Sequence, residues 1–395
     1  MIRSVFSVAA RRARLAHRHL LLSPERADNV ARVCDTLVGL HASDPVTVYL
    51  SAATRLRSPT IELIDRALYD DRAIIRHHAM RRTLWVVTPE VGRVAHASTT
   101  TTLVDPLRRS LGKLLVDNCV TDDPERWLDQ AMAEMTGTIA TLGEATARQI
   151  GEALPHLRVP LTVPPDNPSG AKVAAHTRVL TLMGFMGTVV RGRPIGTWVS
   201  GQYRWALADD WLRREVNPDE RSRAAAELVD RYLRSFGPAS TTDIVWWTGW
   251  GKRVASTAIE VAGAEPAQSA DRELWVAQGD HAHDPDPGAW VALLPGLDPS
   301  VMGWKQRDWY LADEYVPMLF DRNGNAGPTV WADGKVVGAW AQTRSGEIVH
   351  HLLEPISARH QRLLDDETER LRSLLGDTRF TIRFPAPLCK QLAAG

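Results

Sequence analysis

The chain has 395 residues, of which 44% are hydrophobic and 24% charged, a balance typical of a folded protein with two or three domains. No run of about 18 apolar residues occurs, so the sequence predicts neither a membrane span nor a membrane partner. The formal net charge is zero, which excludes a simple polycation. Three widely separated cysteines exclude a disulfide framework and favour a reducing cytoplasm.

The first 82 residues are rich in arginine, with 14 Arg and no Lys against 8 acidic residues. The start, "MIRSVFSVAARRARLAHRHLL", is expected to be a folded helix rather than a signal peptide, because charge interrupts its apolar stretch. Guanidinium groups are planar and always charged, so this segment suits either phosphate contacts or a solvated helix surface. The candidate DNA contacts in it are Arg11, Arg12, Arg81 and Arg82.

Short helices dominate the first third of the chain. Their expected starts, each a capping residue followed by proline, are Ser23-Pro24, Asp44-Pro45 and Ser58-Pro59. The segment "TLWVV" at 83–87 is predicted to be a short buried strand, and longer helices are expected near 102–118 and 124–138. Three short helices followed by a strand are typical of a winged helix.

A second unit is expected to begin near Leu142. The segment "LGEATARQIGEAL" predicts a short helix, a turn and a second helix, and "SGAKVAAHTRVLTLMGFM" predicts a third. The segment "GTVVRGRPIGTWVSGQYRWALADDW" then reads as a hairpin, so the winged-helix order is repeated. Arg191, Arg193 and Arg204 lie on or beside this wing and are candidate DNA contacts.

A third unit follows, with a helix that ends at Gly237-Pro238 and then the helix-turn-helix pattern "TTDIVWWTGWGKRVASTAIEVAG". Strands come next, among them a hairpin turned at Asp333-Gly334, where Lys335 is a further candidate DNA contact. The tail is expected to hold one helix at 357–374 and a last strand, "RFTIRF". The histidines and aspartates of the loop 280–288 lack a partner motif, so a solvated loop is favoured over a metal site.

These patterns predict a mainly α fold with small β-hairpins (α+β) and three winged-helix domains in tandem. The expected limits are 1–135 for the first domain with a helical extension, 136–212 for the second, and 213–395 for the third with a C-terminal β-rich extension. No P-loop, dinucleotide fingerprint or metalloprotease motif occurs, so no metal or nucleotide cofactor is expected.

The stretch "LHASDP" leaves two interpretations open. Asp44 before Pro45 is typical of a helix N-cap, which makes the stretch a turn between two helices. His41 and Ser43 alternate about Ala42, so their side chains can also point together into a groove as a catalytic pair.

Several segments in a specific order resemble one family, the bacterial tandem winged-helix DNA glycosylases typified by the azinomycin-resistance enzyme and its crosslink-unhooking relatives. The segments are "LVGLHASDPVTVYLSAATRL", "MRRTLWVV", "YLRSFGPASTTDIVWWTG", "LLPGLDPSVMGWKQRDWYL" and "PTVWADGKVVGAW". The resemblance implies three winged helices around a concave DNA-binding channel. It also implies base excision from alkylated or crosslinked duplex DNA, without a cofactor.

The family's catalytic motif is Gln-x-Gln or Gln-x-Asp, just before Asp-Pro. His41 and Ser43 occupy these two positions here, so the resemblance implies that they are the catalytic residues. The neighbouring segment also departs from the commoner pattern, since Arg82 stands for Gly and Trp85 for His.

The expected function is therefore that of a monofunctional DNA glycosylase that hydrolyses the N-glycosidic bond of bulky N7-alkylated purines. The protein is expected to be a cytoplasmic, nucleoid-associated monomer. With an ordinary histidine pKa near 6.5, base release should rise through roughly pH 6–7 as His41 loses its proton. The alternative is a winged-helix protein that binds DNA or sequesters lesions without catalysis, which the change at both motif positions favours.

Overall fold

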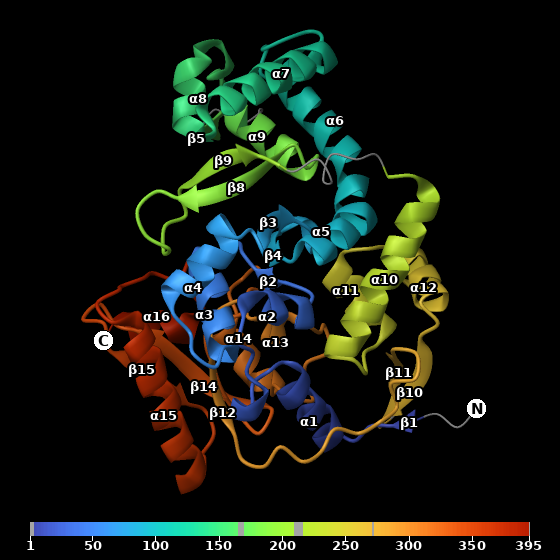
Figure 1. Cartoon of the computed structure of the whole chain (residues 1–395), viewed down its shortest axis with the longest axis vertical. Helices are drawn as coiled ribbons and strands as arrows, with labels where there is room; N and C mark the ends of the chain where they lie inside the picture. Colours follow the sequence, from blue (N-terminus) through green and yellow to red (C-terminus); the bar gives the residue numbers. More distant parts are fainter. Residues whose placement is uncertain (1–3, 165–169, 209–215, 271, 395) are drawn as a thin grey trace.

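The computed structural model describes residues 4–164, 170–208, 216–270 and 272–394 (Figure 1). The described residues form many helices and small sheets of two to four strands, which confirms the predicted α+β class. One order of elements, a helix, a short strand, two helices and a two-stranded hairpin, occurs twice, and it recurs a third time with a single bridge in place of the short strand. This is the order of a winged helix, so the prediction of three such units in tandem is confirmed.

In the first winged helix the short strand pairs with the second strand of the hairpin, in the sheet order β2-β4-β3. Its elements are α2 (Val30–Thr36), β2 (Leu40–His41), α3 (Pro45–Arg55), α4 (Ile61–Asp65), β3 (Ile75–His78) and β4 (Leu84–Val87). The side chain of Asp44 caps α3 and Pro45 takes the first helical position, as predicted. The strand β4 also lies within the predicted segment.

The second winged helix lies at the top of Figure 1 and has a hydrophobic core of its own. Its elements are α7 (Pro124–Leu142), β5 (Glu144–Thr146), α8 (Ala147–Ala153), α9 (Ala175–Phe185), β8 (Val189–Pro194) and β9 (Tyr203–Leu207). The sheet order β5-β9-β8 repeats that of the first unit. Between α8 and α9 lies a small hairpin, β6 (Pro160–Val163) and β7 (Ala171–Ala174), and α6 (Thr101–Asp117) packs against α7 and α9.

In the third winged helix a single bridge between Ala239 and Trp275 replaces the first strand. Its elements are α10 (Pro218–Phe236), α11 (Thr241–Thr248), α12 (Lys252–Val261), β10 (Glu265–Ser269) and β11 (Arg272–Val276). The N-terminal strand β1 (Ser4–Val5) pairs in parallel with β10, and α1 (Val8–Arg18) packs against α10. The start of the chain thus belongs structurally with the third unit.

The C-terminal extension is an antiparallel sheet in the order β12-β13-β14-β15. Its strands and helices are β12 (Val291–Leu294), β13 (Thr329–Ala332), β14 (Lys335–Gln342), β15 (Ile348–Leu352), α15 (Ala358–Leu375) and α16 (Pro387–Ala394). Shorter helices elsewhere are α5 (Pro89–Ala95), α13 (Pro299–Met302) and α14 (Val316–Leu319). Both α15 and α3 of the first unit pack against β12, which joins the extension to the first winged helix.

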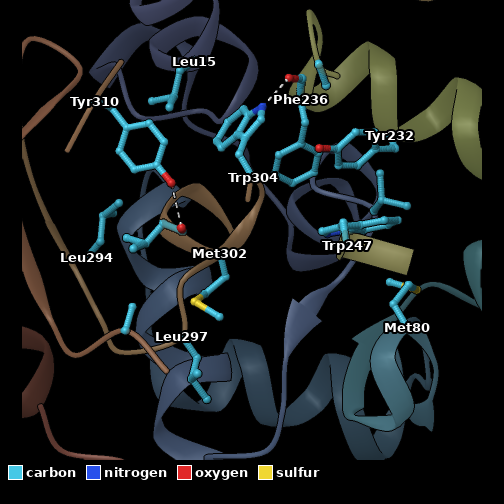
Figure 2. Close-up of a cluster of buried hydrophobic side chains, with 14 of the residues drawn as sticks. Leu15, Met80, Tyr232, Phe236, Trp247, Leu294, Leu297, Met302, Trp304 and Tyr310 are labelled. Atoms are coloured by element: carbon cyan, nitrogen blue, oxygen red, sulfur yellow. Dashed lines mark hydrogen bonds between the residues drawn. The ribbon is translucent and has the colours of Figure 1, made fainter. Parts of the chain in front are cut away.

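One hydrophobic cluster joins the first winged helix, the third and the C-terminal extension (Figure 2). Met80 of the first unit, Trp247 of the third and Tyr310 of the following loop all belong to it and are fully buried. Within it, the Trp304 indole donates to the Phe236 carbonyl at 3.0 Å, and the Tyr310 hydroxyl donates to the Val301 carbonyl at 2.9 Å. Each large side chain buried here contributes about 2–3 kcal/mol, so the three regions are stabilised together.

The predicted start of a helix at Ser23 is wrong. Ser23–Glu25 form one 3-10 turn, and α2 begins only after Asn29, whose side chain accepts the amide of Arg32 at 2.9 Å. The chain between them is extended because Ala27 exchanges backbone hydrogen bonds with the end of α3. A pairing with a distant segment therefore overrides the local Ser-Pro signal.

Two further predicted elements differ in the structure. The first short helix expected near residue 142 is the strand β5, because the capping box of Thr146 and Gln149 starts the helix α8 only after it. The expected last strand "RFTIRF" has no ladder, since the Gln342 side chain bonds the Phe380 amide and the Thr378 carbonyl in place of a neighbouring strand.

The expected domain limits remain predictions. The limit between residues 135 and 136 falls inside α7. The limit between residues 212 and 213 lies outside the described residues.

Candidate functional site

The stretch "LHASDP" runs from the strand β2 to the cap of α3. His41 is the last residue of β2, and the Ala42 amide continues the pairing by donating to the Leu84 carbonyl at 2.8 Å. The strand ends at His41, and Ser43 and Asp44 form a bend before α3, so Ser43 follows the strand end by two residues. The sheet on one side and the helix cap on the other fix both positions.

His41 is enclosed by aromatic and cationic groups. Its side chain is 2% exposed, and its ring centroid lies 4.1 Å from that of Trp85, its partner across the strands. Nη2 of Arg81 lies 3.1 Å from Nε2 of His41, and an arginine can only donate, so Nε2 accepts and the ring proton lies on Nδ1. Burial and the neighbouring Arg81 charge hold the pKa of His41 well below its ordinary value. His41 is therefore neutral at physiological pH.

Ser43 and Asp44 are held by the C-terminal segment. The Arg383 guanidinium donates to the Ser43 carbonyl at 3.2 Å, and the Arg383 amide donates to Oδ2 of Asp44 at 2.8 Å. Oδ1 of Asp44 accepts the Val46 amide at 3.1 Å, and burial raises the pKa of this carboxyl. The Ser43 side chain is only half-buried. Asp44 is thus the predicted cap and also a tether for the tail, a role that gave no local signal in the sequence.

Arg81 and Arg82 form the turn between β3 and β4, and both have the left-handed backbone, with φ of 55° and 60°. The Arg81 guanidinium lies 4.1 Å from the ring centre of Trp246 in α11, so it bridges the first and third winged helices. Arg82 is exposed. Its guanidinium is therefore accessible to a phosphate, whereas that of Arg81 contacts His41 and Trp246 in the free protein.

The wing arginines have different environments. Arg191 lies over Tyr203 and Trp205, at 5.7 and 5.3 Å from the ring centres. Arg193 is paired with Asp70 at 2.8 Å and with Asp65 at 3.5 Å, which ties the wing to the first unit. Arg204 is half-buried and has no ion pair within the described part of the chain. Arg191 likewise has no ion pair among the described residues, so Arg193 alone of the three is already paired with carboxylates there.

The remaining predicted DNA contacts have structural partners. Arg11 is 4% exposed, with its guanidinium 4.2 Å from the Trp309 ring centre, and it lies in the interior. Arg12 donates to the Trp309 carbonyl at 2.8 Å, and Lys335 is paired with Glu354. These three side chains hold the N-terminal helix and the C-terminal sheet in place.

Metal ligands do not gather anywhere among the residues that the structure describes. The loop that carries Asp280 and His281 is held against α1 by ion pairs, since Asp280 is paired with Arg14 and Arg18. In the same described ranges, no helix combines the length and apolarity needed to cross a membrane.

Three winged helices in tandem, with arginines beside a buried strand end, define a DNA-binding class of protein. A family model described as "DNA glycosylase AlkZ-like" matches residues 34–374. The chain therefore belongs to the AlkZ-like DNA glycosylase family, which confirms the resemblance found in the sequence and the expected function in DNA repair.

A solved structure, the DNA glycosylase AlkZ of Streptomyces sahachiroi, has the same fold. It is 20% identical in sequence, the match covers 95% of this chain and 98% of that one, and the TM-score is 0.71. No curated protein matches the chain.

Proposed function

We propose that this DNA glycosylase excises bulky N7-alkylated purines from duplex DNA, with His41 and Ser43 at the reacting nucleotide. One observation carries the proposal: a buried, neutral imidazole stands at the end of a fixed strand, two residues before Ser43 in the chain. The same two positions carry the catalytic motif in the family that the sequence resembles. The protein is proposed to act as a monomer, in the cytoplasm at the nucleoid.

The chemistry needs little from the protein. An N7-alkylated purine is cationic and leaves as a neutral base, so the leaving group needs no added proton. A water oxygen bonds to the anomeric carbon as the glycosidic bond breaks, and the water's proton passes to the neutral imidazole of His41. Ser43 holds the water by hydrogen bonding. Nε2 of His41 is occupied by Arg81 in the free protein, so Arg81 must shift before this nitrogen can take the proton.

We propose Arg82, Arg191 and Arg204 as phosphate contacts, because none of them has an ion pair among the described residues. The other predicted contacts are held within the free protein, which concerns Arg11, Arg12, Arg81, Arg193 and Lys335. Crosslinked DNA remains a proposed substrate as well, because the family includes crosslink-unhooking enzymes.

The test is a gel assay of abasic sites in a duplex that carries N7-alkylguanine. His41→Ala should reduce base release by at least about 100-fold, the usual contribution of a positioned general base, with DNA affinity nearly unchanged. His351→Ala is the control, because His351 is an exposed histidine of β15. Binding of the lesion duplex by the parent protein without any base release would instead establish the non-catalytic alternative.

A further inference from the structure

Two arginines from different regions meet on one indole beside His41. The Arg81 guanidinium lies 4.1 Å from the ring centre of Trp246, and that of Arg307 lies 5.0 Å from the same centre. Arg307 is also 4.7 Å from the Phe320 ring centre. The turn of the first winged helix, the helix α11 of the third and the loop after α13 thus converge at this point.

This pair of cations lacks a countercharge. Within the described ranges neither guanidinium has a carboxylate at ion-pair distance, whereas Arg14, Arg55 and Arg193 do. The Nε atoms of Arg81 and Arg307 are buried without a hydrogen-bond partner, and so is Nδ1 of His41. The polar side chains that contact them, His41 for Arg81 and the Tyr310 hydroxyl for Arg307, are neutral, and the nearby Asp243 carboxylate accepts the amides of Lys305 and Gln306.

Holding two like charges together in a half-buried place is unfavourable in the free protein. Burial lowers the pKa of Arg81 to about 10, and the Arg307 charge adds to the shift in the same direction. Gly249, the left-handed cap of α11, lets the Arg81 backbone approach, since a Cβ there would lie 3.2 Å from Cα of Arg81. This close approach of the backbone at Gly249 holds Arg81 near Arg307. An anion bound between the two guanidinium groups would remove their repulsion.

We propose that Arg81 and Arg307 form a binding site for one phosphodiester of the DNA strand that carries the reacting nucleotide. This inference rests on the proposed function, since it takes DNA as the substrate. The hydrogen bond from Arg81 to His41 places the phosphate beside the nucleotide that His41 serves. When Arg81 turns to the phosphate, Nε2 of His41 becomes free to accept a proton.

The test measures duplex affinity by fluorescence anisotropy at several salt concentrations. Arg307→Gln should lower the slope of log K against log salt by about 0.9, the value of one lost phosphate contact in B-DNA. Arg307→Lys, which keeps the charge, should restore most of that slope. The control is Arg362→Gln, an exposed arginine on α15, which should leave the slope unchanged.

Thermal unfolding separates this role from a structural one. The midpoint of Arg307→Gln should be unchanged or raised, because a repulsive pair is removed, whereas a purely structural arginine gives a lower midpoint. Arg307→Met keeps the apolar stem against Phe320 and serves as a second charge-removing variant if Arg307→Gln does not fold. An unchanged salt slope in the folded variant overturns the phosphate site.

Two further results have separate meanings. If inorganic phosphate raises the unfolding midpoint of the parent protein while the duplex slope of the variant stays unchanged, the site takes free phosphate and the assignment to DNA is wrong. If the parent protein binds no duplex even at low salt, the proposed function itself fails.

Discussion

Among the described residues, the His41 ring has one hydrogen-bond partner, the guanidinium of Arg81, and the imidazole stays neutral over the whole physiological range. The sequence predicted the place of this histidine through the family motif. It could not predict the environment, because Arg81 reaches His41 only through the turn between β3 and β4. Arg383 and Arg307 gave no signal either, since their contacts join segments hundreds of residues apart.

The neutral imidazole changes the expected pH profile of base excision. Because the pKa of His41 lies well below 6.5, the single-turnover rate should be flat from about pH 6 to 8, rather than rise through pH 6–7. Arg81→Met removes the neighbouring cation, so the pKa should rise and the acid limb should move to higher pH. A parent profile that rises with a midpoint of about 6.5 would contradict this environment.

The left-handed backbone of Arg82 gives a second prediction. A side chain at φ of 60° costs about 1 kcal/mol, and the family pattern has glycine at this position. Arg82→Gly should raise the free energy of unfolding by about 0.5–1 kcal/mol and weaken duplex binding, as measured by denaturation and anisotropy. Arg82→Ala retains the Cβ, so it should weaken binding without the gain in stability.

At the scale of elements, α3 was predicted with its cap and its proline because both signals are local. Two predictions that failed, the helix start at Ser23 and the strand "RFTIRF", concern segments whose backbone hydrogen bonds go to distant partners. The start expected at Ser58 lies two residues early, because Thr60 is the N-cap of α4. Period and capping residues therefore predict an element well where its partners are near in sequence. They fail where a remote strand or side chain supplies the hydrogen bonds.

Asp44 has both a local and a distant hydrogen-bond partner, so its substitution measures what the distant one contributes. It caps α3 and also binds the Arg383 amide, so Asp44→Ala loses the cap and leaves a partly buried amide without a partner. The cost should be about 2 kcal/mol, roughly twice that of a cap alone. Asp123→Ala is the matched control, because Asp123 is an exposed N-cap of α7 with one such bond and should cost about 1 kcal/mol. Equal losses in urea unfolding would show that the Arg383 contact contributes nothing.

At the scale of the whole molecule, buried neutral histidines make the fold sensitive to acid. Six of them have pKa values lowered mainly by burial: His19 to about 3, His78 to about 3, His96 to about 4, His41 and His77 well below the ordinary value, and His176 below it. The unfolded chain takes up protons near pH 6.5 whereas the folded chain does not. The free energy of unfolding is therefore highest, as far as these histidines are concerned, above about pH 6.5, and it declines below that pH.

Each of these histidines should contribute a loss of about 1.4 kcal/mol per pH unit below about pH 6.5. The free energy of unfolding, measured in urea between about pH 7.5 and 5, should consequently fall steeply on the acid side. A flat stability curve across that interval is the result that contradicts the burial of these rings.

The shared core also has a consequence for synthesis on the ribosome. Met80 and Trp85 emerge early, but they belong to one cluster with Trp331, Val336 and Cys389, which are translated some 250 to 300 residues later. Translation proceeds at about 5–20 residues per second, so the apolar face of the first winged helix stays uncovered for tens of seconds until these partners are synthesised. The nascent chain therefore depends on chaperones over that interval. If translation stops before α16, the first winged helix also lacks part of its core, because Cys389 belongs to the same cluster.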